Sequence, residues 1–191
     1  MSLYELLLLL HVTAVIVWVG AVTATDLLWL RAERTRDPAQ LATMGQLQEY
    51  LTPRLFIPAS LLSLLFGVLL VPAGPWSFGD LWIVIGLTAF AASFLTGFLY
   101  LRPQGQKMGE IIGRHGPGSP EARQHGKKLL VVSRVQLLLL FLVVADMVLK
   151  PTAEDPWTVV VLAAILVAAI AAGAAVLRRS RATSGLSEAI R

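Results

Sequence analysis

The chain has 191 residues, of which 56% are hydrophobic and 15% are charged, and its formal net charge at pH 7 is +4. The hydrophobic residues form long uninterrupted blocks, which excludes an ordinary soluble core built from amphipathic elements. The sequence contains no cysteine, which excludes disulfides, thiolate metal ligands, iron–sulfur clusters and cysteine nucleophiles. We expect a single transmembrane domain, residues 1–180, followed by a disordered cytoplasmic tail, residues 181–191.

Five hydrophobic segments are long enough to cross a bilayer, which requires about 20 apolar residues in a helix. We place the spans at residues 3–30, 54–72, 80–101, 128–149 and 157–177. Lipid offers no hydrogen-bond partner to the backbone, so each span must be helical. The predicted fold is therefore all-α, a polytopic transmembrane helical bundle.

Lysine and arginine are distributed unevenly among the segments that connect these spans. They gather after the first span, after the third span and in the C-terminal tail, whereas residues 71–80 contain none. Residues 150–156 contain only Lys150. This bias predicts that the N-terminus lies outside and the C-terminus lies in the cytoplasm, in a bacterial plasma membrane. We expect the basic residues to contact the lipid bilayer and not nucleic acid.

The segment between the first two spans contains helix signals and helix breakers. Asp37, as an N-cap before Pro38, predicts a short helix that lies at the inner surface. Pro53 and Pro58 are expected to break or kink the chain where the second span begins.

The long segment after the third span divides into two parts. Its first half, residues 105–118, is rich in glycine and is expected to be mobile. Ser119 followed by Pro120 is typical of a helix start, and we expect one helix from there to Lys150. The fourth span would then extend into the cytoplasm.

Small residues recur at a spacing of four on the third and fifth spans, which lets helices approach closely. They are Ser93 and Gly97 on the third span, and Ala164, Ala168, Ala172, Ala169 and Gly173 on the fifth. These faces predict close packing within the bundle or a homo-oligomer formed through the two spans.

The first span carries an imidazole inside an apolar helix. From the helical rise, His11 lies about 12 Å inside the outer end of its helix. Trp18 and Thr25 follow at seven-residue spacing on the same face, with Ala14 and Ala21 between them, which leaves room for a flat group. An ionisable side chain at this depth faces protein or water. Its role can be functional, or it can be a hydrogen bond that holds helices together.

The fourth span ends with a carboxylate in the same leaflet. Asp146 lies about 6 Å inside the outer end by the same rise. The outer half can therefore assemble the His11 imidazole, the Asp146 carboxylate and the Met147 thioether. A carboxylate that accepts a hydrogen bond from one ring nitrogen leaves the other free to bind a metal or haem iron. Alternatively, Asp146 forms a local pair with Lys150, four residues further on.

The inner half contains a second group of charged residues. Asp26 lies about one turn from the inner end of the first span, where Arg54 or Arg134 can pair with it. We interpret these three residues as a structural charge cluster that holds the helices in register. The chain has no ladder of carboxylates across the membrane, no HExxH and no nucleotide-binding motif, and whether it is an enzyme stays open.

Leu10-His11 followed by Trp18-Val19-Gly20 resembles the first helix of several bacterial membrane families. These include the copper-resistance D (CopD) family and the HemJ-type protoporphyrinogen oxidases. The chain is most similar to the DUF2269 family of bacterial integral membrane proteins, which it also resembles at the end of the fourth span, residues 147–151.

The resemblance to HemJ implies a haem b bound through His11, and the resemblance to the copper family implies copper handling through the same residue. The chain has no second membrane histidine for a bis-histidine site, so a second axial ligand would have to be Met147, Lys150, water or His11 of another subunit. We expect a haem b or another redox cofactor near the outer leaflet, with His11 as the metal ligand and Trp18, Asp146 and Met147 beside it. The alternative is a non-enzymatic membrane scaffold, an accessory subunit or a copper-handling protein.

Overall fold

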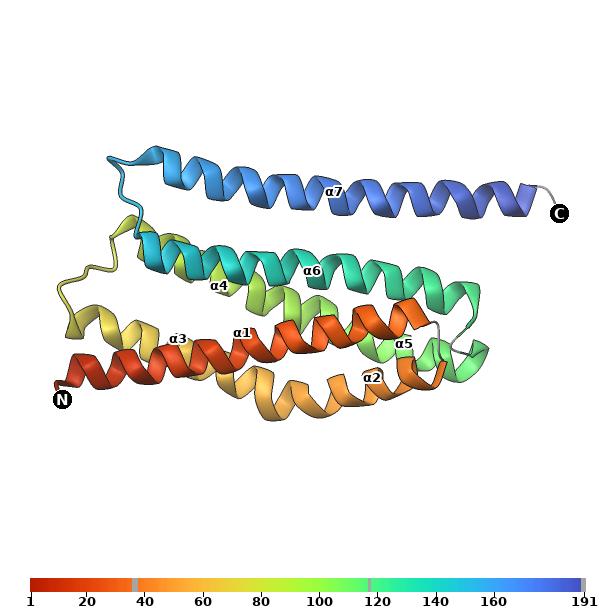
Figure 1. Cartoon of the computed structure of the whole chain (residues 1–191), viewed down its shortest axis with the longest axis horizontal. Coiled ribbons are helices and arrows are strands. Elements are labelled where there is room, and N and C mark those ends of the chain that lie inside the picture. Colours follow the sequence, from red (N-terminus) through yellow and green to blue (C-terminus); the bar gives the residue numbers. More distant parts are fainter. Residues whose placement is uncertain (36–37, 117, 190–191) are drawn as a thin grey trace.

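The computed structural model describes residues 1–35, 38–116 and 118–189, and this part of the chain is a bundle of helices without strands (Figure 1). Within these described residues, five helices are long and apolar enough to cross a membrane: Leu3–Ala32, Ala39–Ala73, Leu81–His115, Pro120–Leu149 and Pro156–Arg178. The all-α class and the five spans are confirmed. The orientation in the membrane stays a prediction, and we use "outer" for the end of the bundle that carries the N-terminus.

Helix α1 (Leu3–Thr35) runs along the length of the bundle, beside the antiparallel helix α3 (Ile57–Ala73) (Figure 1). Its buried residues follow one another at steps of four and seven along one face: Leu7, Ala14, Trp18, Thr25 and Ala32. This spacing is typical of helices that pack side by side over their length. The face predicted for Trp18 and Thr25 is therefore the buried face of α1.

The second span is one long helical rod that bends in the middle (Figure 1). Helix α2 (Pro38–Leu51) continues through a π-helical segment, Thr52–Phe56, into α3. Pro53 cannot donate a backbone hydrogen bond, and the wider π turn absorbs that loss without ending the helix. Of the two outcomes predicted at Pro53 and Pro58, a break or a kink, the helix shows the bend and no break. The predicted N-cap, Asp37, lies outside the described residues.

The third span is also longer than predicted. Helix α4 (Leu81–Leu95) continues through a second π-helical segment, Thr96–Leu101, into α5 (Arg102–His115). The glycine-rich segment expected to be mobile is thus helical as far as His115. Packing against α6 explains this, because the imidazole Nε2–H of His125 donates to the carbonyl of Gln104 at 2.9 Å, and the buried Met108 faces Gly126.

Helix α6 (Pro120–Leu149) is the central element and packs against α1, α4, α5 and α7. As predicted, it is continuous and starts at Ser119, whose hydroxyl accepts a hydrogen bond from the amide of Ala122 at 3.2 Å. Helix α7 (Pro156–Ala189) lies on the outside of the bundle, mainly against α6 (Figure 1). It is helical as far as Ala189. The disordered tail stays a prediction.

Candidate functional site

His11 is held by helix α3. Its Nδ1 lies 2.8 Å from the carbonyl oxygen of Ser63. A carbonyl oxygen can only accept, so Nδ1 carries the proton and donates it. In the neutral imidazole Nε2 then keeps a free lone pair. Metal-binding histidines are oriented in this way, with one ring nitrogen bonded to a carbonyl and the other directed at the metal.

Helix α3 makes room for the imidazole with a glycine. A Cβ atom at Gly67 would lie 2.9 Å from Cε1 of His11 and 3.1 Å from its Nδ1. A larger residue would therefore force the ring or the helix away, and glycine permits the close approach. Sequence reasoning missed both Ser63 and Gly67. Their spacing of four is the same small-residue pattern that drew attention to Ser93 and Gly97, and it was the signal that could have found them.

Trp18 belongs to the hydrophobic core. The residue is 8% exposed and packs with Ala59 of α3 and Leu140 of α6. Its ring meets Phe90 of α4 edge to face, with 5.5 Å between the ring centroids and 64° between the planes. Trp18 of α1 therefore contacts α3, α4 and α6. The face of α1 that carries Trp18 and His11 packs these helices together.

Asp146 lies at the contact between α6 and α4. It is 1% exposed, and neither of its carboxylate oxygens has a hydrogen-bond partner. The expected hydrogen bond between Asp146 and His11 is therefore not formed, because the carbonyl of Ser63 takes that place. A Cβ atom at Gly86 would lie 3.5 Å from Oδ2 of Asp146, which identifies this glycine as its neighbour on α4.

Met147 packs at the same contact. A Cβ atom at Gly86 would overlap the terminal methyl of Met147 and lie 3.8 Å from its sulfur. Met147 and Asp146 thus face α4, whereas His11 faces α3. The structure does not place the predicted imidazole, carboxylate and thioether in one site.

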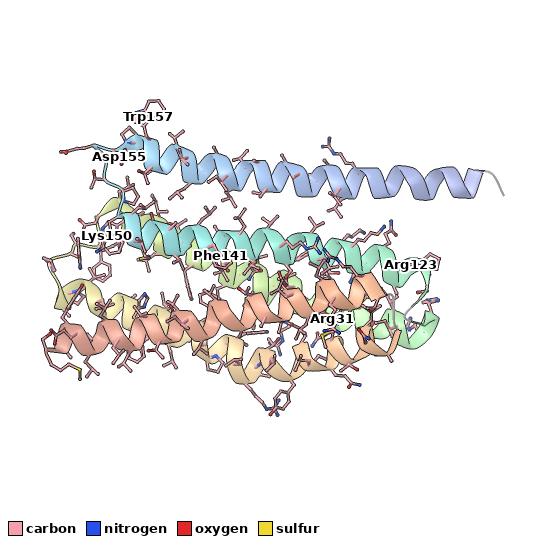
Figure 2. All side chains as sticks on the ribbon, viewed as in Figure 1. Arg31, Arg123, Phe141, Lys150, Asp155 and Trp157 are labelled. Carbon is pink, nitrogen blue, oxygen red and sulfur yellow. The ribbon has the colours of Figure 1, made fainter. Side chains whose placement is uncertain are left out.

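Lys150 does not pair with Asp146, contrary to the alternative prediction. Its ammonium lies 4.6 Å from the ring centroid of Trp76 and 5.7 Å from that of Trp82. These two indoles meet edge to face at 5.2 Å, on the turn between α3 and α4 and at the start of α4. Lys150 stands at the outer end of α6 (Figure 2), where it adopts a left-handed conformation with φ of 46°. Aromatic rings attract the ammonium, which explains why it turns toward them.

The inner charge cluster forms only in part. The hydroxyl of Ser133 donates to Oδ1 of Asp26 at 2.5 Å, and Arg134 acts electrostatically on the same carboxylate. Arg54 lies elsewhere, because its guanidinium stacks 4.3 Å above the ring of Tyr50 and donates to the Tyr50 carbonyl at 3.4 Å. The prediction of Asp26 and Arg134 as partners stands, and that of Arg54 is wrong. Ser133 is the partner that the sequence did not indicate.

Ser133→Ala is expected to lower the free energy of unfolding by about 0.6 kcal/mol, a typical value for a hydrogen bond between membrane helices. The variant also leaves the Asp26 carboxylate short of a donor, so a loss of up to about 1.7 kcal/mol is reasonable. Thr88→Ala is the matched control, since the Thr88 hydroxyl donates only to Val84 of its own helix. Unfolding in detergent should separate the two variants, and equal losses would contradict the role of Ser133.

The small-residue faces of the third and fifth spans differ in what they contact. The side-chain amide of Gln136 on α6 donates to the carbonyl and hydroxyl oxygens of Ser93 at 3.3 Å each, and a Cβ atom at Gly97 would lie 3.5 Å from the same nitrogen. The third-span face is thus a contact within the chain. On α7, Gly173 faces Val131 of α6. The alanine face, by contrast, is exposed: Ala164, Ala168 and Ala172.

In the described part of the chain, five helices are apolar enough to cross a membrane, and buried polar groups of α1 bond to α3 and α6, which together define an integral membrane protein. The family model "Predicted integral membrane protein (DUF2269)" matches residues 5–151, and the chain belongs to this family. The match includes nearly all of α1 and ends after α6, before α7 begins. Comparisons with curated proteins and with solved structures found no match.

Proposed function

We propose that this protein binds haem b in the outer half of the bundle, with Nε2 of His11 as the axial ligand. The observation that carries the proposal is the hydrogen bond of 2.8 Å between Nδ1 of His11 and the carbonyl of Ser63. It fixes the proton on Nδ1 and leaves Nε2 as the ligand atom. The likeness of Leu10-His11 and Trp18-Val19-Gly20 to the HemJ-type and CopD families supports the same role.

Of the side chains considered as ligands, His11 alone is placed to bind the proposed haem. Met147 packs on Gly86, and Lys150 lies on two indoles, so neither faces the helix pair that holds His11. The remaining choices for the second axial ligand are water and His11 of a second copy. When bound, a haem supplies electron transfer or oxygen chemistry, and the chain supplies the position and the orientation of the ligand.

The distribution of charge supports a location in a bacterial plasma membrane with the N-terminus outside. Arg31 and Arg123 lie at the end of the bundle opposite to Lys150 and Asp155 (Figure 2). Positive charge gathers at the cytoplasmic ends of membrane helices. In this proposed orientation, a haem at His11 would lie near the outer leaflet.

The test is the absorption spectrum of the purified protein after expression with a haem precursor. A Soret band is expected in the natural chain and is expected to be lost in His11→Ala. His125→Ala is the matched control, because His125 contacts the Gln104 carbonyl at the inner end, and it should keep the band. A chain that stays colourless, or a band that His11→Ala leaves unchanged, would overturn the proposal.

A second candidate is a non-enzymatic accessory subunit or scaffold, or a copper-handling protein. The close fit of the imidazole against Gly67 favours a structural role, because His11 then locks α1 to α3. Among the described residues, no three His, Cys, Asp or Glu side chains are grouped to hold a metal ion. Elemental analysis distinguishes these alternative functions. Bound copper that is lost in His11→Ala supports copper handling. A chain that contains no copper but purifies with a stoichiometric partner supports the scaffold.

A further inference from the structure

The proposed haem site leaves one buried charge without an explanation. Asp146 is 1% exposed, and neither of its carboxylate oxygens accepts a hydrogen bond. An ionised carboxylate that is buried without a donor is costly in any protein, and this applies strongly inside a membrane. The neutral, protonated carboxyl group is therefore the form of Asp146 that this burial favours.

A proton is the ligand that this geometry can hold. Metal cations such as calcium require six or more oxygen ligands, whereas a proton requires a single carboxylate. Within the part of the chain that the structure describes, no further acidic or histidine side chains gather with Asp146 to make a metal site. The ligand class is thus a proton, taken from water at the outer surface.

Lys150 is the basic side chain closest to Asp146 along α6, and the helices that pack there carry no other charged side chain near it. Helix α4, which packs against Asp146, has no charged side chain between Leu81 and Leu95, and α7 has none between Pro156 and Leu177. On α6, Asp146 is the only charged residue between Arg134 and Lys150. Four of the other groups at the outer end bond elsewhere: Glu5 accepts from the amide of Ser2, His11 donates to the Ser63 carbonyl, Asp80 accepts from the amide of Ser77, and Asp155 accepts from Thr158. Tyr4 and Glu154 lie at the same end, and Glu154 is exposed to solvent.

Lys150 has two alternative partners within reach of its own side chain. It caps the end of α6, and its backbone amide donates to the carbonyl of Asp146 at 2.8 Å, so its side chain starts one turn from the Asp146 carboxylate. Its ammonium instead rests on Trp76 and Trp82, which lie at the α3–α4 turn. An ionised carboxylate competes with the aromatic rings for the ammonium, whereas a neutral, protonated one does not. The charge on Asp146 therefore decides which partner Lys150 takes.

We propose that Asp146 is a proton-binding site at the outer end of the bundle and that Lys150 responds to its occupancy. With the proton bound, the carboxyl group is neutral and the Lys150 ammonium stays on the two indoles. When the proton leaves to water, the carboxylate draws the ammonium away from them. This movement frees the end of α6 from the α3–α4 turn. The proposal is independent of whether a cofactor binds at His11.

The test is tryptophan fluorescence of the full chain in lipid nanodiscs, followed from acidic to alkaline pH. The natural chain is expected to show a transition as the ammonium leaves the indoles. Asp146→Asn imitates the neutral acid and should lose the transition, and Lys150→Gln should lose it too. Asp155→Asn is the matched control at the same end of the bundle and should keep it. A double variant, Trp76→Phe with Trp82→Phe, should lose the transition, which assigns it to this pair.

A transition that survives in Asp146→Asn, or its absence in the natural chain, would overturn the proposal. If Asp146→Asn does not fold, Lys150→Gln and the double tryptophan variant decide the question. An unchanged transition in either of them would then also count against the proposal.

Discussion

Gly67→Ala is expected to destabilise the bundle by about 1–3 kcal/mol, the usual cost of forcing extra atoms into a packed contact. The new Cβ atom would lie 2.9 Å from Cε1 of His11. The imidazole cannot turn aside freely, because its Nδ1–H is bonded to the Ser63 carbonyl at 2.8 Å. Either that hydrogen bond breaks or α1 and α3 separate, and both changes weaken the most extensive helix pair in the protein.

Unfolding in detergent measures this cost. Gly20→Ala is the matched control, since Gly20 also lies in a membrane helix and nothing stands within 4 Å of its Cβ position. Alanine there gains helix propensity, so the control should be neutral or slightly stabilising. In a His11→Ala background the space beside position 67 is open, and Gly67→Ala should cost much less. A cost that does not depend on His11 would show that the contact is not the cause.

The five spans could be predicted because hydrophobic length alone determines them. The predictions were least accurate at the inner ends, where the prolines were expected to break or kink the helix and the glycine-rich segment was expected to be mobile. Pro53 is accommodated by a π-helical segment, and the glycine-rich segment of α5 is held by the contact of His125 with Gln104. The first effect is a local change of helix type, and the second arises from tertiary packing, which overrides local propensity. The start of α6 at Ser119 was predictable, since a cap acts within one turn.

The sequence identified the ionisable side chains of the candidate site but not the groups that they contact. His11 and Asp146 stand out in a sequence because ionisable groups are rare in membrane helices. Depth along the helix correctly placed both in the outer half, but depth says nothing about which neighbour a side chain faces. His11 faces Gly67 on α3, whereas Asp146 faces Gly86 on α4. The partners are a backbone carbonyl and two glycines, which carry no side-chain chemistry, and the small-residue spacing of Ser63 and Gly67 was the one sequence signal for the partners of His11.

Trp18→Ala is expected to cost about 3 kcal/mol or more in the free energy of unfolding, the range for removing a large buried aromatic side chain. Trp18 is 8% exposed and contacts Ala59, Leu140 and Phe90, so the cavity would open where four helices meet. Lipid tails are as apolar as leucine, so the loss is one of van der Waals packing and not of hydrophobic transfer from water.

Trp157→Ala is the matched control for this prediction. Trp157 is 75% exposed at the start of α7, where its ring points away from the bundle (Figure 2). Its removal should change the unfolding free energy by no more than about 0.5 kcal/mol. Trp18→Phe keeps an aromatic ring in contact with Phe90 and should lie between the two variants. If Trp18→Ala and Trp157→Ala have the same unfolding free energy, the packing of Trp18 does not hold the four helices together. The polar contacts of Asp26 and Gln136 with neighbouring helices would then be the main stabilising contacts of the bundle.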